Sequence, residues 1–263
     1  MKKERLDKIL VDLGYFDTKS KASAAILAGN VKINSEVITK AGFQIAPEKK
    51  LDIEIKSMPY VSRGGFKLEK ALKTFDVKIQ DRICIDAGAS TGGFTDCLLQ
   101  NGAKKVYAVD VGYGQLAWKI RNDERIKVIE RTNIKNCAFS DIYSDADELA
   151  DLLVMDLSFI SIEKVLSNLK KLLKPEFHEM ICLIKPQFEA GKDLVDKGGV
   201  VKDKNVHIEV INNVINFAQK LGYVVLNLTV SPIKGPSGNI EYLIHIATEG
   251  DGIDFSVKDV IAN

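Results

Sequence analysis

The chain has 263 residues, of which 46% are hydrophobic and 28% charged, and this composition excludes a wholly disordered protein. At roughly 150 residues per domain, the length predicts one large domain and a small appendage. The 37 basic and 36 acidic side chains leave a net charge of +1, so no global basic field points to a nucleic-acid partner.

The cysteines and the apolar runs bear on metal binding, membrane insertion and cellular compartment. No C-x-x-C pair occurs, so neither a zinc knuckle nor a redox pair is predicted and we expect no metal; the four cysteines are Cys84, Cys97, Cys137 and Cys182. No apolar run approaches the roughly 18 residues of a membrane-spanning helix, and the start shows no signal peptide. We therefore expect a reduced, cytoplasmic compartment.

The amino-terminal part predicts two short helices. Apolar residues between Leu6 and Leu13 recur at helical spacing, and Gly14 follows where a helix would end. A second helix is predicted for residues 19–28, with Asp17 or Thr18 as its cap.

Strands are predicted after these helices because the apolar period changes to two. Residues 31–33 and 51–55 alternate apolar and polar side chains, and Asn34-Ser35 predicts a turn between strands. Two helices and a small sheet thus form a compact unit of about sixty residues.

Basic side chains are unevenly distributed along the chain. Residues 1–60 hold 11 basic and 8 acidic side chains, which leaves 26 and 28 for residues 61–263. Several of the basic residues lie on or next to the predicted helix pair: Arg5, Lys8, Lys19, Lys21 and Lys32. Such a face either contacts RNA phosphates or is only a solvated surface.

A second unusual segment, Ser62–Leu68, follows a break in the pattern at Met58-Pro59-Tyr60. It pairs two glycines with the cations Arg63 and Lys67, and Lys67 opens a helical pattern. A lysine in the first turn of a helix is disfavoured by the helix dipole, so its position suggests a function, the alternative being an ordinary exposed lysine.

From residue 82 onward, short apolar runs alternate with helical patterns, which is typical of a doubly wound parallel sheet. The predicted strands are 83–86, 105–110, 127–130, 152–156, 180–185, 223–230 and 242–247. The clearest predicted helices are 162–173 and 206–221. We therefore predict an α/β fold for this part.

A glycine-rich loop, Asp86–Phe94, follows the first of these strands. Glycines let the backbone approach a ligand, and a helix beginning near Gly92 presents free N–H groups. Asp110 ends the next strand, where a carboxylate accepts hydrogen bonds from ribose hydroxyls. The dinucleotide pattern G-x-G-x-x-G fails because Ser90 replaces its second glycine, and no phosphate loop is present. The loop predicts a nucleotide-like ligand, the alternative being a structural tight turn.

Charged residues end two later strands. Asp156 closes one apolar strand and Lys185 closes the next, and open α/β sheets place their ligands at these carboxyl ends. Because a buried lysine needs an acid nearby, we expect Lys185 to pair with Asp156, either in a site or as an ordinary ion pair at the sheet rim. Glu241 precedes the last strand and is expected at the same edge.

The remaining candidate residues give weaker evidence of function. Tyr113 and Trp118 follow Asp110 and are predicted either to line the base of a bound nucleoside or to pack in the core. The three histidines stand apart from any carboxylate or cysteine cluster and are predicted to be structural: His178, His207 and His245.

Several of these motifs resemble known families. Arg5-Leu6-Asp7, residues 18–22 and residues 26–34 resemble the small RNA-binding module named after the fourth small-subunit ribosomal protein, although Ser35 stands where that family usually has glycine. The form D-x-G-x-x-x-G-G-F of the glycine loop resembles the S-adenosylmethionine loop of the FtsJ-like ribose methyltransferases. The tetrad of ribose 2′-O-methyltransferases is matched in order and context by Lys67, Asp156, Lys185 and Glu241.

Over nearly its whole length the chain resembles the TlyA family, whose members are often labelled hemolysins and are similar to cytidine 2′-O-methyltransferases of ribosomal RNA. The resemblance implies an RNA-binding domain at 1–58, a linker at 59–66 and a Rossmann-like, FtsJ-like methyltransferase domain at 67–263. It implies S-adenosylmethionine as cofactor, bound by Asp86, Gly88, Ser90, Thr91, Gly92, Gly93, Phe94, Asp110 and Asp156. Its implied RNA contacts are Arg5, Lys8, Lys19, Lys21, Lys32 and Arg63.

The implied reaction is 2′-O-methylation of ribosomal RNA, of either subunit, by a monomer or weak homodimer. Lys185 is expected to take or steer the hydroxyl proton, Asp156 to orient it, Lys67 to hold the substrate oxygen and Glu241 to fix one of the lysines. The alternative assignment, in which Lys67 is the base, remains open. Two other functions remain: a non-catalytic RNA-binding or ribosome-assembly factor, and a membrane-active hemolysin, for which no spanning or amphipathic segment is visible.

Overall fold

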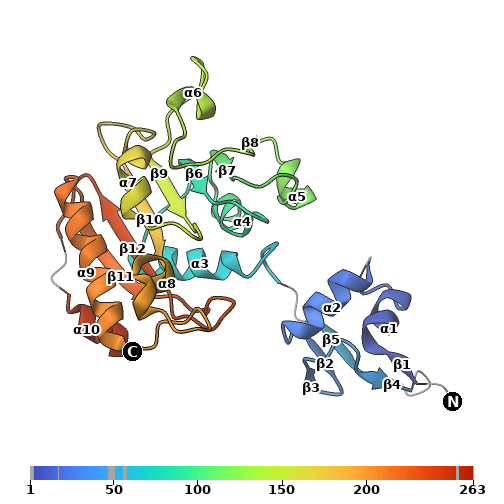
Figure 1. Ribbon diagram of the computed structural model, residues 1–263. Helices are drawn as coiled ribbons and strands as arrows, with labels where there is room; N and C mark the ends of the chain where they lie inside the picture. The colour runs from blue at the N-terminus through green and yellow to red at the C-terminus, as the bar shows by residue number, and fades with distance from the viewer. Residues whose placement is uncertain (1–2, 17, 47–50, 56–57, 253–254, 263) are drawn as a thin grey trace. The chain divides into compact units, whose positions relative to one another are not determined.

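The chain divides into two compact units, Met1–Pro59 and Tyr60–Asn263 (Figure 1). The computed structural model describes residues 3–16, 18–46, 51–55, 58–252 and 255–262, so Asp17, one of the two predicted caps, lies outside the described residues. The division places Pro59 of the predicted linker in the first unit and residues 60–66 in the second. There the Tyr60 ring packs over Gly65, where an added Cβ would lie 2.2 Å from the tyrosine Cγ.

The first unit contains the predicted pair of helices and short strands. Its elements are β1 (Glu4–Arg5), α1 (Leu6–Asp12), α2 (Lys19–Leu27), β2 (Val31–Ile33), β3 (Glu36–Ile38), β4 (Gln44–Ile45) and β5 (Ile53–Ile55). Thr18 caps α2, since its side-chain oxygen accepts the Lys21 N–H. Leu13 lies beyond α1 and is exposed. A small apolar core joins the helices to the strands, with Leu6, Leu10, Ile26 and Val31 fully buried.

The predicted turn at Asn34-Ser35 is confirmed. β2 pairs antiparallel with β3 across it, and φ is +51° at Asn34 and +69° at Ser35. A two-residue hairpin of this kind needs positive φ at both positions. Asn34 also accepts the Asp52 N–H with its side-chain oxygen at 3.1 Å. This contact fixes the turn against the segment around Asp52, although serine replaces the usual glycine at position 35.

The second unit is the predicted α/β domain. Its strands are β6 (Ile83–Ala87), β7 (Lys105–Val109), β8 (Ile126–Ile129), β9 (Leu152–Met155), β10 (Glu179–Ile184), β11 (Val224–Val230) and β12 (Tyr242–Ala247). Its helices are α3 (Gly64–Phe75), α4 (Gly93–Gln100), α5 (Trp118–Arg121), α6 (Phe139–Ile142), α7 (Glu163–Lys170), α8 (Pro186–Glu189), α9 (Lys204–Lys220) and α10 (Val257–Ala262), with a 3₁₀ turn at Lys192–Leu194. Strands and long helices lie within a few residues of the predicted ranges.

The strand order in this sheet is β11-β12-β10-β9-β6-β7-β8. The chain runs outward from β6 to β8 and then returns to β9 on the other side of β6, so the loops after β6 and β9 separate and leave a crevice between them. One expectation is wrong: the sheet is mixed, because β12 is antiparallel to both β10 and β11.

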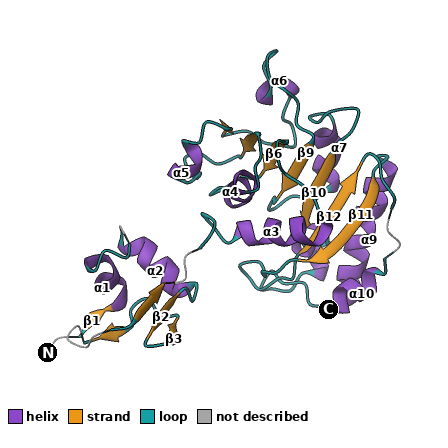
Figure 2. Cartoon of the chain, turned by 180° about the vertical axis from the view of Figure 1, so that it is seen from behind, coloured by secondary structure: helices purple, strands orange, loops and turns teal. Residues whose placement is uncertain are grey.

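Helices cover both faces of the sheet (Figures 1 and 2). Apolar side chains alternate between the two faces along each central strand, as in β6, where Ile83 and Ile85 pack on one side and Cys84 on the other. The first face is covered by α7 and α9, and the second by α3 and α4. This packing fixes the carboxyl ends of the strands, from which the site is built.

Candidate active site

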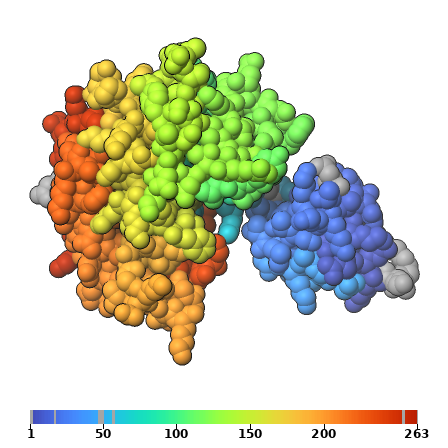
Figure 3. All heavy atoms as spheres, turned by 45° about the horizontal axis from the view of Figure 1, so that its top comes forward, coloured from blue at the N-terminus to red at the C-terminus, as the bar shows by residue number. Residues whose placement is uncertain are grey.

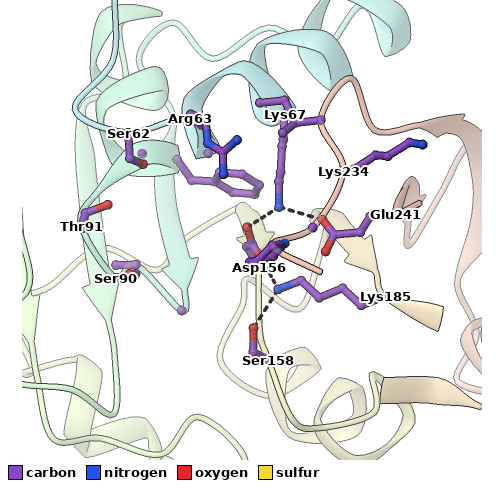
Figure 4. Close-up of a pocket in the computed structure, with 18 residues that line it drawn as sticks. Ser62, Arg63, Lys67, Ser90, Thr91, Asp156, Ser158, Lys185, Lys234 and Glu241 are labelled. Carbon is purple, nitrogen blue, oxygen red and sulfur yellow. Dashed lines mark hydrogen bonds and ion pairs between the residues drawn. The ribbon is translucent and has the colours of Figure 1, made fainter. Parts of the chain in front are cut away.

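Four charged side chains meet at the carboxyl edge of the sheet (Figure 4). Lys67 Nζ donates to Glu241 Oε2 at 2.8 Å and to Asp156 Oδ2 at 3.2 Å. Lys185 Nζ lies 2.6 Å from Asp156 Oδ1 and donates to Ser158 Oγ at 2.9 Å. Asp156 therefore bridges the two lysines, and two ammonium groups face two carboxylates.

The fold explains how residues so distant in sequence converge. Asp156 follows β9 directly, and Lys185 follows β10 and caps α8. Glu241 precedes β12, and only because β12 runs antiparallel does its amino end lie at the edge where the parallel strands end. Lys67 comes from α3, which begins at Gly64, so Lys67 is not in the first three residues of the helix and the predicted conflict with the helix dipole is weaker than expected.

Burial makes this network electrostatically strong. The side chains of Lys67, Asp156, Lys185 and Glu241 are 12%, 21%, 10% and 1% exposed. Burial lowers the pKa of Lys67, but Asp156 and Glu241 raise it by more, so the net pKa lies above its ordinary value. Lys67 is therefore held as an ammonium group at neutral pH.

The glycine loop after β6 packs tightly against its neighbours. Gly88 has a φ of +90°, and a Cβ there would lie 2.7 Å from the Asp156 carbonyl oxygen. Gly93 approaches the start of α3, where its Cβ would lie 2.9 Å from the Gly65 nitrogen. At these two glycines the loop lies directly against Asp156 and against the start of α3. A side chain at either position would prevent this close approach.

Two adjoining cavities open at this edge. One, of about 400 Å³, is lined by all four members of the charged network together with Arg63 and Lys234. The other, of about 420 Å³, is lined by residues including Asp110, Gln115, Asn133 and Ile160, and no lysine or arginine is among the described residues that line it. Gly88, Ser90, Asp156 and Ser158 line both. Asp156, which bridges the two lysines, thus stands at the boundary between the cavities, and the other three members of the network line only the first of the two.

Asp110 has the position expected for a ribose ligand. Its carboxylate accepts the Ser90 N–H at 2.8 Å and the Gly112 N–H at 2.6 Å. These two bonds fix the carboxylate at the wall of the second cavity. The lone pairs that remain are available for hydroxyl groups.

The other predicted cofactor residues divide into two sets. Ser90, Thr91, Gly93 and Phe94 line the first cavity. Asp86 and Gly92 line neither. The Asp86 carboxyl is fully buried, accepts the Thr95 hydroxyl at 2.6 Å, and has its pKa raised to about 7 by burial. Asp86 and Gly92 therefore support the conformation of the loop and do not face either cavity.

Core packing, one of the two predictions for the aromatic pair after β7, is wrong. Tyr113 and Trp118 line neither cavity and do not pack in the core, since they are 69% and 78% exposed. The histidines agree with their structural prediction. All three are buried, and His178 and His207 hydrogen-bond Tyr223 and Tyr242.

Sequence reasoning missed several residues at the site. Ser158, two positions after Asp156, contacts Lys185 and lines both cavities. Thr132, Asn133 and Ile134 line the second cavity just beyond β8. The rule that ligands bind at the carboxyl ends of strands, applied to this third strand as well, identifies that segment.

The predicted RNA contacts in the first unit lie on its surface. Arg5 pairs with Asp7 at 2.6 Å, Lys8 with Glu4 at 3.2 Å and Lys32 with Glu54 at 3.1 Å. Lys19 and Lys21 are exposed on α2. The pairs of Lys8 and Lys32 are exposed on both sides and are therefore worth little, so these two cations remain available to phosphates. Arg5 instead holds the fully buried Asp7 carboxylate with two hydrogen bonds. Arg63 lies in the second unit, at the start of α3, and is exposed at the first cavity.

The described residues contain no cluster of three or more histidine, cysteine, aspartate or glutamate side chains able to hold a metal ion. None of the helices in this part of the chain combines the length and apolarity needed to cross a membrane.

Fold and site define a methyltransferase of the FtsJ-like class joined to a small RNA-binding domain. The FtsJ-like methyltransferase family matches residues 60–248 and the S4 domain family matches residues 4–51. This match confirms the predictions of a methyltransferase and of S-adenosylmethionine as its cofactor.

Relatives cover nearly the whole chain. Hemolysin A of Brachyspira hyodysenteriae is 45% identical over 92% of this chain and 98% of the relative. The 16S/23S rRNA (cytidine-2′-O)-methyltransferase TlyA of Mycobacterium tuberculosis is 41% identical over 95% and 92%. A solved structure from Streptococcus thermophilus, provisionally named a hemolysin, is 41% identical with a TM-score of 0.75 and covers 100% of this chain and 95% of that one. The chain belongs to the TlyA family.

Proposed function

We propose that this chain methylates the 2′-hydroxyl of a cytidine in ribosomal RNA. The observation that carries the proposal is the charged network of Lys67, Asp156, Lys185 and Glu241, which lines the first cavity and borders the second at Asp156. A ribose hydroxyl is a poor nucleophile at neutral pH, so its methylation requires close positioning and removal of a proton. The relative named as a 16S/23S rRNA (cytidine-2′-O)-methyltransferase supports the choice of RNA and nucleotide.

The second cavity fits S-adenosylmethionine. Asp110 and Asp156 lie at its wall, and its described lining residues include no lysine or arginine. A cationic sulfonium that carries no phosphate suits such a lining, whereas a dinucleotide or nucleoside triphosphate does not. Asp110 would hold the ribose, and the backbone around Gly88 and Ser90 would pass close to the ligand. The bound cofactor supplies an electrophilic methyl group.

The first cavity then receives the target nucleotide. Lys67 is held charged between two carboxylates, so it is suited to binding the substrate oxygen. Lys185 shares a single carboxylate with Lys67, and its other partner is the neutral hydroxyl of Ser158. We assign proton removal to Lys185 for this reason, with Asp156 orienting it and Glu241 fixing Lys67. As the base, Lys185 would act as a neutral amine that has released one ammonium proton to solvent, and its Nζ would then take the proton of the 2′-hydroxyl.

The first unit would bring the RNA to this site. Its S4 match and its exposed lysines on α2 support binding to a ribosomal subunit through phosphates. We retain the division into residues 1–58 for RNA binding and 67–263 for catalysis. The substrate is the RNA of the small subunit, the large subunit or both.

The test uses Lys185→Ala and the full chain. Labelled methyl transfer is measured on small and large ribosomal subunits from a strain that lacks the gene. We expect turnover to be abolished while affinity for the subunits changes less than about twofold. Lys220→Ala is the matched control, because this lysine is exposed in the last turn of α9, next to the start of β11 at the opposite edge of the sheet. Near-normal turnover by Lys185→Ala would overturn the assignment of the base.

A further inference from the structure

The loop that follows β7 exposes large side chains that the proposed reaction does not use. Tyr113 and Trp118 are 69% and 78% exposed. Tyr113 lies beside Arg131, whose guanidinium carbon is 4.2 Å from the ring centroid. We call Tyr113, Trp118 and Arg131 the aromatic platform. Two exposed aromatic rings within six residues, one of them beside a guanidinium group, indicate a binding surface.

The loop is held in place although these side chains are exposed. Gly114 N–H donates to Glu130 Oε1 at 2.8 Å, and Arg131 N–H donates to the Gly112 carbonyl at 3.0 Å. At the other end, Ala117 N–H donates to the Thr91 carbonyl at 3.2 Å. The rings are therefore displayed on a fixed backbone, which reduces the entropy lost when a partner binds.

The charge around the platform is opposite to that of the rest of its unit. Residues 111–135 contain six basic and three acidic side chains, whereas residues 61–263 contain 26 and 28. Within the described part of the chain, Arg131 and Lys135 form no ion pair with a carboxylate, and Lys119 is 72% exposed beside a single acid. A basic surface with exposed aromatic rings complements a polyanion that carries flat apolar groups.

The platform lies next to the proposed reaction. Asp110, Val111 and Gln115 of the same loop line the second cavity, while Tyr113 and Trp118 do not. Figure 3 shows the green segment that contains this loop on the surface of the second unit. The two cavities share Gly88, Ser90, Asp156 and Ser158, so a nucleic acid whose target nucleotide enters the first cavity would pass near this loop.

We propose that the aromatic platform stacks unpaired bases of the RNA substrate near the methylated nucleotide. The inference rests on the proposed function, because it takes RNA as the substrate. Unpaired bases stack on aromatic side chains and on arginine planes, and sequence matters little to such contacts. Tyr113, Trp118 and Arg131 would thus select single-stranded or loop RNA, while the first unit supplies phosphate contacts.

The test compares Trp118→Ala and Tyr113→Ala with Trp118→Phe and Tyr113→Phe, which keep a stacking ring. Affinity for the two ribosomal subunits from the gene-deletion strain is measured by binding alone, and affinity for S-adenosylmethionine by calorimetry. We expect each alanine variant to bind its subunit roughly 5- to 150-fold more weakly, the range for loss of one base stack. The phenylalanine variants should recover most of this affinity, and cofactor affinity should stay within twofold.

Phe177→Ala is the matched control. Phe177 is also exposed, at 40%, but it precedes β10 at the amino edge of the sheet. Its substitution should leave subunit binding unchanged. Arg131→Gln should weaken binding and lower the slope of log affinity against log salt by roughly 1, since one cation near phosphate is lost.

Each other outcome overturns a different statement. Unchanged subunit affinity in the alanine variants overturns the platform, and if cofactor affinity falls instead, the loop serves the cofactor. Concentration-dependent self-association that Trp118→Ala removes, with RNA binding intact, would assign the surface to a second protein copy. Wild-type protein that binds subunits through Trp118 but transfers no methyl group contradicts the proposed function and leaves the platform standing.

Discussion

Asp86 gives the sharpest quantitative prediction. It is a fully buried carboxyl beneath the glycine loop, and burial raises its pKa from 3.8 to about 7. Between these two values the unfolded chain releases the proton of Asp86 while the folded protein keeps it, so stability falls as pH rises through this window. The stabilising contribution is complete below pH 3.8 and is lost by about pH 7.

The substitution Asp86→Asn removes this titration and keeps an oxygen that accepts the Thr95 hydroxyl. Two pKa units separate pH 5 from a pKa of about 7, and at 1.36 kcal/mol per unit they amount to roughly 3 kcal/mol. We therefore expect the free energy of unfolding of Asp86→Asn, relative to wild type, to rise by roughly 3 kcal/mol between pH 5 and pH 8.

Urea denaturation of both proteins at the two pH values measures this difference. Asp193→Asn serves as the control, because Asp193 is exposed in the 3₁₀ turn Lys192–Leu194. An equal effect of Asp86→Asn at pH 5 and pH 8 would refute the reasoning, since it would show that the carboxyl is already ionised in the folded protein at pH 5.

Two further substitutions test the site. Gly88→Ala places a Cβ 2.7 Å from the Asp156 carbonyl at a φ of +90°; we expect a loss of about 1–3 kcal/mol in thermal denaturation and weaker binding of S-adenosylmethionine in calorimetry, and unchanged cofactor affinity would contradict the close-approach role. Glu241→Gln removes one of the two carboxylates that raise the pKa of Lys67; we expect methyl transfer to fall at least about tenfold, and a normal rate across pH 6 to 9 would show that the Glu241 carboxylate is not required.

Much of the site follows from where strands end. Asp156 and Lys185 close predicted strands, and because parallel strands share one carboxyl edge, their 2.6 Å contact is foreseeable. Glu241 is different. An apolar strand reads the same in either direction, so the antiparallel course of β12, which alone carries Glu241 to this edge, is decided by tertiary packing.

Exposure of loop side chains is the part that sequence reasoning does not supply. Tyr113 and Trp118 are large aromatic residues of the kind that usually pack in a core or bind a ligand. In this structure both side chains are exposed, on a loop held by backbone hydrogen bonds. Ser158 contacts Lys185 only because the chain bends directly after β9. Periodicity describes helices and strands, whereas such positions depend on how each loop leaves its strand.

The central claim is methylation of a cytidine 2′-oxygen with Lys185 as the base. Its most direct measurement is mass spectrometry of nucleosides from ribosomal subunits of the gene-deletion strain, after incubation with S-adenosylmethionine and either wild type or Lys185→Ala. We predict 2′-O-methylcytidine at a defined nucleotide with wild type and none with the variant. A methyl group on a base or on another nucleoside, or equal 2′-O-methylcytidine from both proteins, would contradict the account.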